Sequence, residues 1–208
     1  MGCNRTYAAG AVVLSAPMLA LLALVAMTAS AVALAQDIEI KERTVYYAVQ
    51  GTSASQLGAQ MATRGPADRF GRRAWGFTAW EVRTTYALTP TDRGCVIEQP
   101  RAHVDIVTTL PVWRKSAGAS WPLRSRWRKM LVSLIRHEAT HREHALLAAR
   151  TATAELERTP VQPTCGDAET RARQVLRAAV LQSRRLSLEF DRDTRHGARQ
   201  GVRLDAGD

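Results

Sequence analysis

The residues best suited to chemistry form the pattern His137-Glu138-x-x-His141. On a helix, residues four apart lie one turn apart on the same face, so both imidazoles can bind one Zn²⁺ at ~2.0–2.1 Å. Glu138 then lies beside the metal, where a carboxylate can take a proton from a zinc-bound water while the metal polarises a scissile carbonyl. The pattern therefore predicts zinc-dependent hydrolysis of peptide bonds, provided that this segment is helical.

The flanking residues favour such a helix, from about Pro122 or Leu123 to Leu156. At about 100° per residue, one mostly apolar arc includes the motif and has His137 at its edge. The arc consists of Trp127, Met130, Leu131, Leu134, Glu138, His141, Ala145, Ala148 and Ala149. A solvated helix with unconnected histidines would instead place Glu138 and His141 on its polar side. The motif is thus expected on the inward face of the helix.

A catalytic zinc needs a third protein ligand, so that one position remains for water. Leu147 excludes the extended pattern in which another histidine follows six residues after His141. His144 lies on the same helix, ~10 Å from His137 along its axis, which is too far for these three histidines to surround one ion. The third ligand is therefore expected outside this helix.

The carboxy-terminal segment offers the remaining candidates. We predict His196 as the third ligand, because Gly197 allows a sharp turn that could direct the imidazole into the core. Asp191 or Thr194 could orient that imidazole through a hydrogen bond. Glu189 and Asp191 are the alternative ligands, and a histidine in a solvated turn is the alternative role for His196.

Residues 1–35 have the pattern of an export signal. Arg5 precedes a long uncharged run of Ala, Val, Leu and Met that ends in Ala33-Leu34-Ala35. These small residues predict cleavage between Ala35 and Gln36, which leaves residues 36–208 as a single zincin-like domain in the periplasm or outside the cell. An uncleaved membrane anchor is the alternative, since the run is long enough to span a bilayer, whereas no later segment is.

Cleavage would remove Cys3 and leave Cys95 and Cys165. In an oxidising compartment, a remaining pair predicts a disulfide, which would close a long loop around the metal helix and contribute ~2–4 kcal/mol. Two free or metal-binding thiols are the alternative.

The chain is strongly basic, with a formal net charge of +10. Because residues 1–35 contain Arg5 as their one charged residue, the mature chain carries +9. Arginines gather in residues 124–128 and 171–185, which would suit an anionic polymer of the cell envelope. Solvated helix faces explain them equally well. Nucleic acid is not an expected partner, because few aromatic residues are interleaved and export removes the protein from intracellular nucleic acid.

The remaining segments predict an α+β fold, with helices packed on a small antiparallel sheet. A strand at 38–49 and a short helix from Thr52 or Ser53 to Met61 come first. A strand at 74–88, with a register break near Trp80, and a strand at 95–110 form a hairpin around the turn at 89–94. A second helix covers Asp167 to Phe190 and precedes an irregular tail. An exposed sheet edge beside the metal helix could bind an extended peptide.

Several motifs together resemble the bacterial DUF922 family of secreted zinc-dependent proteases. They are Tyr46-Tyr47 with Gly51, Thr78-x-Trp80, Thr109-Leu110-Pro111-x-Trp113, His137-Glu138-x-x-His141, the cysteine pair, and Phe190-Asp191-x-x-Thr194-x-His196-Gly197. The resemblance implies an exported metallopeptidase-like domain without a particular substrate. Two positions depart from the expected pattern: Phe190 replaces a tyrosine that could bind an oxyanion, and His144 replaces an apolar residue.

Two functions fit these observations. One is a zinc peptidase or amidase that acts on a protein or peptide of the cell envelope, with Glu138 as general base. The other is a non-catalytic envelope-binding module that retains a structural metal. The intact Glu138 favours the enzyme, since a structural site needs ligands and no carboxylate base. The sequence specifies neither a required partner nor an oligomeric state.

Overall fold

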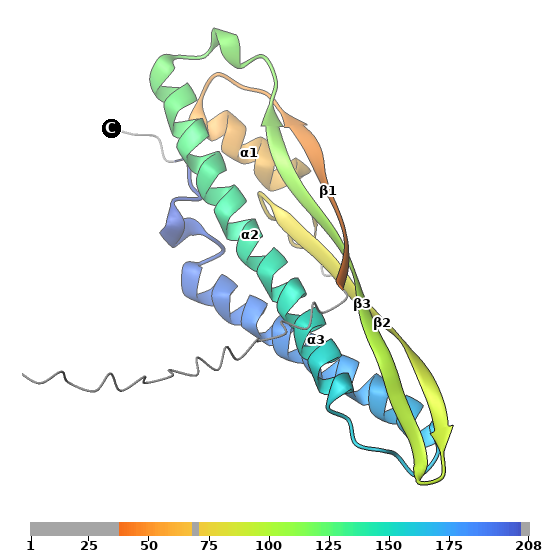
Figure 1. The fold of residues 1–208 in the computed structure, drawn as a ribbon. Helices are drawn as coiled ribbons and strands as arrows, with labels where there is room; N and C mark the ends of the chain where they lie inside the picture. Colours follow the sequence, from red (N-terminus) through yellow and green to blue (C-terminus); the bar gives the residue numbers. More distant parts are fainter. Residues whose placement is uncertain (1–37, 68–70, 205–208) are drawn as a thin grey trace, which may run out of the picture. The chain divides into compact units, whose positions relative to one another are not determined.

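A computed structural model describes residues 38–67 and 71–204 (Figure 1). The predicted signal peptide and its cleavage site lie outside these residues. The structure confirms the α+β class and the predicted order of strand, helix, hairpin, long helix and helix. The elements are β1 (Ile38–Val49), α1 (Ala54–Arg64), β2 (Phe77–Thr91), β3 (Gly94–Trp113), α2 (Trp121–Glu157) and α3 (Cys165–Thr194), with 3₁₀ turns η1 (Ser116–Gly118) and η2 (Ala198–Gln200).

The three strands form a mixed sheet in the order β1-β3-β2. β2 and β3 pair antiparallel as the predicted hairpin, but β1 pairs parallel to β3, from Ile38 beside Ala102 to Val49 beside Trp113. The prediction of an antiparallel sheet was therefore wrong for β1. β3 lies between β1 and β2, which run in opposite directions, so β3 is parallel to β1 and antiparallel to β2. Strand composition does not specify which neighbour a strand pairs with, so the sequence did not predict this arrangement.

The predicted register break was also misplaced. The pairing of β2 with β3 is continuous through Trp80, and the irregularity lies between Thr85 and Ala87. Along the continuous part, Thr78 and Val82 are buried and Trp80 is half-buried, whereas the residues between them are exposed. This alternation is that of a strand with one face against a core.

Side-chain caps set where the helices begin. Ser53 caps α1 as predicted, accepting a hydrogen bond from the Gln56 amide at 3.2 Å, and the helix ends at Gly65. Ser120 caps α2, which begins at Trp121, slightly before the predicted start. Thr164 caps α3 by accepting from the Asp167 amide at 3.1 Å, so this helix starts before Asp167. It also continues four residues past Phe190.

α2 and α3 lie side by side on one face of the sheet, and α1 lies near β1 (Figure 1). One buried cluster joins β3 to α2. It contains Ala102, Val104 and Ile106 of β3 and the small residues Ala145, Ala148 and Ala149 of α2. These alanines allow the helix to approach the sheet closely. The other face carries polar pairs, such as His103 with Glu39 and Arg83 with Asp105, and is solvated.

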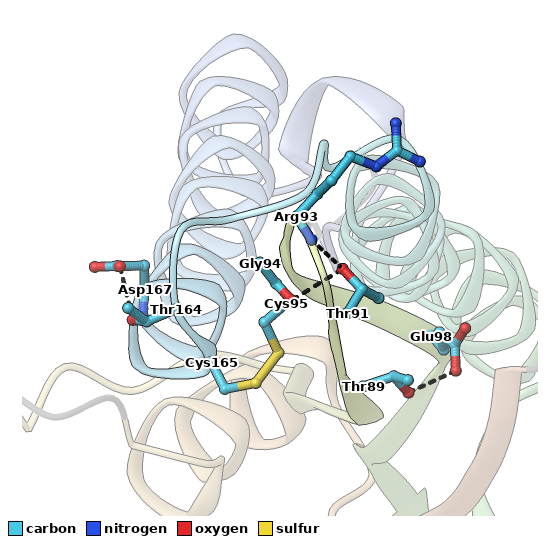
Figure 2. Close-up of a disulfide and its surroundings, with 9 residues drawn as sticks. All are labelled: Thr89, Thr91, Arg93, Gly94, Cys95, Glu98, Thr164, Cys165 and Asp167. Carbon is cyan, nitrogen blue, oxygen red and sulfur yellow. Dashed lines mark hydrogen bonds between the residues drawn. A yellow bond between two sulfur atoms is a disulfide. The ribbon is translucent and has the colours of Figure 1, made fainter.

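The predicted disulfide between Cys95 and Cys165 is confirmed, with its Cα atoms 5.0 Å apart (Figure 2). It joins the start of β3 to the first residue of α3. Cys95 and Gln162 also exchange two main-chain hydrogen bonds of 2.8 and 2.9 Å. A Cβ atom at Gly94 would lie 2.1 Å from the Gln162 carbonyl oxygen, so only glycine permits this approach. The hairpin is thus fastened to the α2–α3 connection.

Within the described ranges, no helix combines the length and the apolar composition needed to cross a membrane.

Candidate metal centre

Three side chains from two helices converge on one point. α2 supplies His137 and His141, and α3, which runs back along α2, supplies Asp191. Each histidine Nε2 atom lies 3.1 Å from Asp191 Oδ1, and the two Nε2 atoms are 3.4 Å apart. The side chains of His137, His141 and Asp191 are 5, 12 and 23% exposed, so the group is enclosed yet reachable from solvent.

The spacing of these atoms fits a zinc ion. Ligand atoms ~2.0–2.1 Å from a tetrahedral zinc are separated from each other by about 3.3 Å, close to the three observed distances. Two imidazole nitrogens and one carboxylate oxygen are also a common ligand set for catalytic zinc. Three protein ligands leave the fourth position for water.

The hydrogen bond on the far side of His137 also bears on metal binding. Its Nδ1 atom lies 2.9 Å from Gln200 Oε1 and donates to it, which leaves a lone pair on Nε2. Nε2 lies 3.1 Å from the carboxylate oxygen of Asp191, so either a proton or a metal ion can be held between these two atoms. Gln200 therefore orients His137 as expected for a metal ligand.

The electrostatics of Asp191 and His137 agree with close pairing. Burial disfavours the charged form of Asp191, but hydrogen bonds from the two histidines outweigh burial and lower its pKa well below the ordinary value. Burial likewise acts to lower the pKa of His137, while hydrogen bonds with Asp191 and Gln200 raise it above the ordinary value overall. Both pKa shifts therefore result from hydrogen bonds between neighbouring side chains.

Glu138 is buried beside the cluster and 4% exposed. Its Oε2 atom accepts a hydrogen bond of 2.8 Å from the hydroxyl of Thr78 on β2. Burial raises the pKa of Glu138, and the Thr78 hydrogen bond and the two histidines oppose that rise. Oε1 points toward Gly76, where an added Cβ atom would lie only 2.9 Å away. One carboxylate oxygen is therefore held, and the other faces a position without a side chain.

The structure places the predicted third ligand, His196, outside the group of three. Its side chain is 79% exposed, and its Nδ1 atom lies 3.7 Å from Asp191 Oδ1. The main chain at His196 is left-handed, with φ of 51°, and its amide donates to the Asp191 carbonyl at 2.7 Å. Asp191, the predicted orienting residue and alternative ligand, lies between the histidines instead.

The other predicted residues of the carboxy-terminal segment have different surroundings. The Thr194 hydroxyl donates to the Phe190 carbonyl and accepts from the Gly197 amide, so it closes the end of α3. Glu189 is not part of the group. The Phe190 ring stacks on His137 with centroids 4.8 Å apart and covers one side of the cluster.

His144 borders the cluster without joining it. Its Nδ1 atom lies 2.9 Å from Ser187 Oγ, and its ring centroid is 6.1 Å from that of His141. The prediction that His144 is not a ligand stays a prediction.

Sequence reasoning missed the roles of Thr78, Gly76 and Gln200. Thr78 belongs to a motif shared with the resembled family, but no local pattern connects it with Glu138, 60 residues later. Gln200 follows the last shared motif, and no local pattern connects it with His137, 63 residues earlier. Gly197 could have signalled a close approach, because a Cβ atom there would lie 3.2 Å from His137 Cγ.

Comparison with known proteins gives one match. A family model described as "Bacterial protein of unknown function (DUF922)" matches residues 44–197, a range that contains the three converging side chains and Glu138. No curated protein and no solved structure matches the chain.

Proposed function

The chain belongs to the DUF922 family, and we propose that it is an exported zinc-dependent peptidase acting on proteins or peptides of the cell envelope. His137, His141 and Asp191 are the proposed zinc ligands, and Glu138 is the proposed general base. The observation that carries the proposal is the zinc-like spacing of three ligand atoms beside a buried carboxylate. Because the family description states no function, the activity is inferred from the site alone.

The chemistry divides between the metal and the chain. Bound zinc would lower the pKa of a water molecule and polarise the carbonyl of the scissile bond. Glu138 would accept a proton from an attacking water as the water oxygen adds to the carbonyl carbon, and would give that proton to the amine nitrogen as the C–N bond breaks. Thr78 holds one oxygen of Glu138 during both transfers, and Gln200 holds His137 in the orientation that presents Nε2.

The sheet offers a place for the substrate. β2 is an edge strand, and its residue Thr78 bonds directly to the proposed base. An extended peptide that paired with this edge would be held by main-chain hydrogen bonds, with one of its carbonyls near the cluster. Such binding depends little on side chains.

A non-catalytic envelope-binding module with a structural metal is the alternative. Structural zinc sites are usually closed by four protein ligands. The group found among the described residues has three members and an adjacent base, which supports the enzyme.

The decisive experiment compares the purified mature chain, residues 36–208, with its Glu138→Gln variant. Both should contain near one zinc per chain, and the variant should cleave a peptide library about 10²–10⁴-fold more slowly, since it keeps the shape of Glu138 and lacks the base. Glu143→Gln is the matched control, because Glu143 is exposed on the same helix. Metal in both proteins without cleavage by either would favour the binding module, and undiminished turnover in Glu138→Gln would refute the mechanism.

Export is part of the same proposal and has its own test. Amino-terminal sequencing of the protein from its native host should begin at Gln36. An intact amino terminus in the membrane fraction would favour the uncleaved anchor.

A further inference from the structure

The outward side of α2 carries a surface that the proposed peptidase does not use. At 100° per residue, Trp121, Arg128, Val132 and Ile135 lie within about 60° of one another around the helix, and Lys129 and Arg136 lie along one side of them. We call these six residues the outer stripe. His137 and His141 lie on the opposite side of the helix. The outer stripe is therefore separate from the candidate metal centre.

The apolar members of the outer stripe are unusually exposed. Trp121 is 66% exposed, and Val132 and Ile135 are each 46% exposed. Single exposed apolar residues are common, but these three share a surface with cations and extend along about four turns of one helix. They present a row of large apolar side chains to solvent.

The charged members have no acidic partner among the described residues. Arg128, Lys129 and Arg136, with Val132 and Ser133, line an open surface hollow of about 330 Å³, and no acidic residue lines it. Within the described residues, the three cations have neither an ion pair nor a hydrogen bond through their side chains. Farther along α2, by contrast, Arg142 pairs with both Glu42 and Glu143. The described part of the chain therefore leaves positive charge uncompensated at the outer stripe.

A lipid bilayer with anionic headgroups matches both properties. A soluble polyanion would account for the three cations and leave the apolar row without a role, whereas an apolar protein surface would leave the cations without partners. At a membrane surface, Trp121, Val132 and Ile135 can enter the boundary between headgroups and acyl chains, while the long cationic side chains reach the phosphates. Tryptophan is typical of this boundary.

We propose that the outer stripe of α2 docks the folded protein reversibly on a bilayer that contains anionic lipids. The candidate metal centre then lies on the side of α2 directed away from the lipid. This binding is peripheral, in agreement with the absence of a membrane-spanning helix among the described residues. It depends on folded surface residues and does not require metal or catalysis.

Cosedimentation of residues 36–208 with vesicles tests the proposal. Vesicles of phosphatidylcholine with phosphatidylglycerol should bind the chain at least about tenfold more tightly than phosphatidylcholine alone, and added salt should weaken the binding. A triple variant with Arg128→Gln, Lys129→Gln and Arg136→Gln should bind these anionic vesicles at least about tenfold more weakly. The matched control replaces Arg171, Arg177 and Arg185 on α3 with glutamine, which changes the net charge equally and should have little effect.

A second pair of variants separates lipid from polyanion. Trp121→Ala with Ile135→Ser should weaken vesicle binding several-fold and leave binding to soluble polyphosphate unchanged. Equal loss in the α2 and α3 charge variants would overturn the proposal in favour of general charge attraction. Vesicle binding that is indifferent to Trp121 and Ile135 would overturn it in favour of a polyanion site, and no binding to anionic vesicles at low salt would overturn it outright. Circular dichroism establishes that each variant is folded.

Discussion

The two ends of α3 are joined to the rest of the molecule by different chemistry. At Cys165, a disulfide, two main-chain hydrogen bonds beside it, and an apolar cluster that includes Ile97 and Leu156 hold the helix to the hairpin. At Asp191, ~39 Å farther along the helix, the contacts are polar and converge on one carboxylate oxygen. The first end holds the fold together, and the second is the candidate metal centre. Stability and the proposed chemistry thus occupy opposite ends of one helix.

The largest expected effect is at the Asp191 end. Asp191→Ala removes a proposed ligand, so zinc affinity should fall by more than about 100-fold, beyond the loss typical for residues that only orient a ligand. Titration against a competing chelator measures the affinity. Asp193→Ala is the control, because Asp193 lies two residues away and its side chain is 70% exposed.

The same titration with His196→Ala compares the two candidates for the third ligand. A sharp loss in His196→Ala with wild-type affinity in Asp191→Ala would identify the histidine, which would then have to turn inward from its exposed position. Loss in Asp191→Ala alone would assign the carboxylate.

The next largest effect is at the Cys165 end. Replacing Cys95 and Cys165 together with serine should lower the free energy of unfolding by ~2–4 kcal/mol, because the unfolded chain is no longer constrained by a closed loop. Urea denaturation measures this change. Zinc affinity should change by less than about threefold. A loss of affinity as large as that expected for Asp191→Ala would show that the two ends are not independent.

A smaller effect is expected at Thr78, which connects the sheet to the candidate site. Thr78→Val keeps the shape and removes the only side-chain hydrogen-bond donor to Glu138 among the described residues, so unfolding should become easier by about 1–3 kcal/mol. Peptide cleavage should slow about tenfold as Glu138 loses its fixed position, while zinc content is unchanged. Thr78→Ser should restore the rate, and failure to do so would mean that the methyl group matters more than the hydroxyl.

The smallest effect is expected at His144. Because this side chain bonds to Ser187 and lies outside the group of three, His144→Ala should change zinc affinity by less than about twofold. A sharp loss in the chelator titration would place a third α2 histidine in the metal centre.

Local patterns in the sequence predicted the features that depend on neighbouring residues. The spacing of His137 and His141 is a property of one helix, so it was predictable. The turn of the hairpin was also predictable from local sequence, although it comprises only Asp92 and Arg93, because residues 89–91 of the predicted turn pair with β3. The cysteine pair was predictable because only two cysteines follow the predicted cleavage site. The place of Asp191 depends on how α3 packs along α2, and the parallel pairing of β1 depends on where β3 inserts. Neither depends on residues close together in the sequence. The sequence alone therefore could not decide between Asp191 and His196 as the third ligand.

Gly76 has a consequence for laboratory evolution of this protein. An alanine there would bring its Cβ atom within 2.8 Å of Leu134 Cδ1 and 2.9 Å of Glu138 Oε1, so even one methyl group would push against the proposed base. A mutant library that randomises the site should therefore keep position 76 fixed and vary Phe190 and His144, which border the histidines without contributing to the ligand set. Position 76 thus restricts new side chains although it supplies no ligand, because Leu134 and Glu138 already occupy the space beside it.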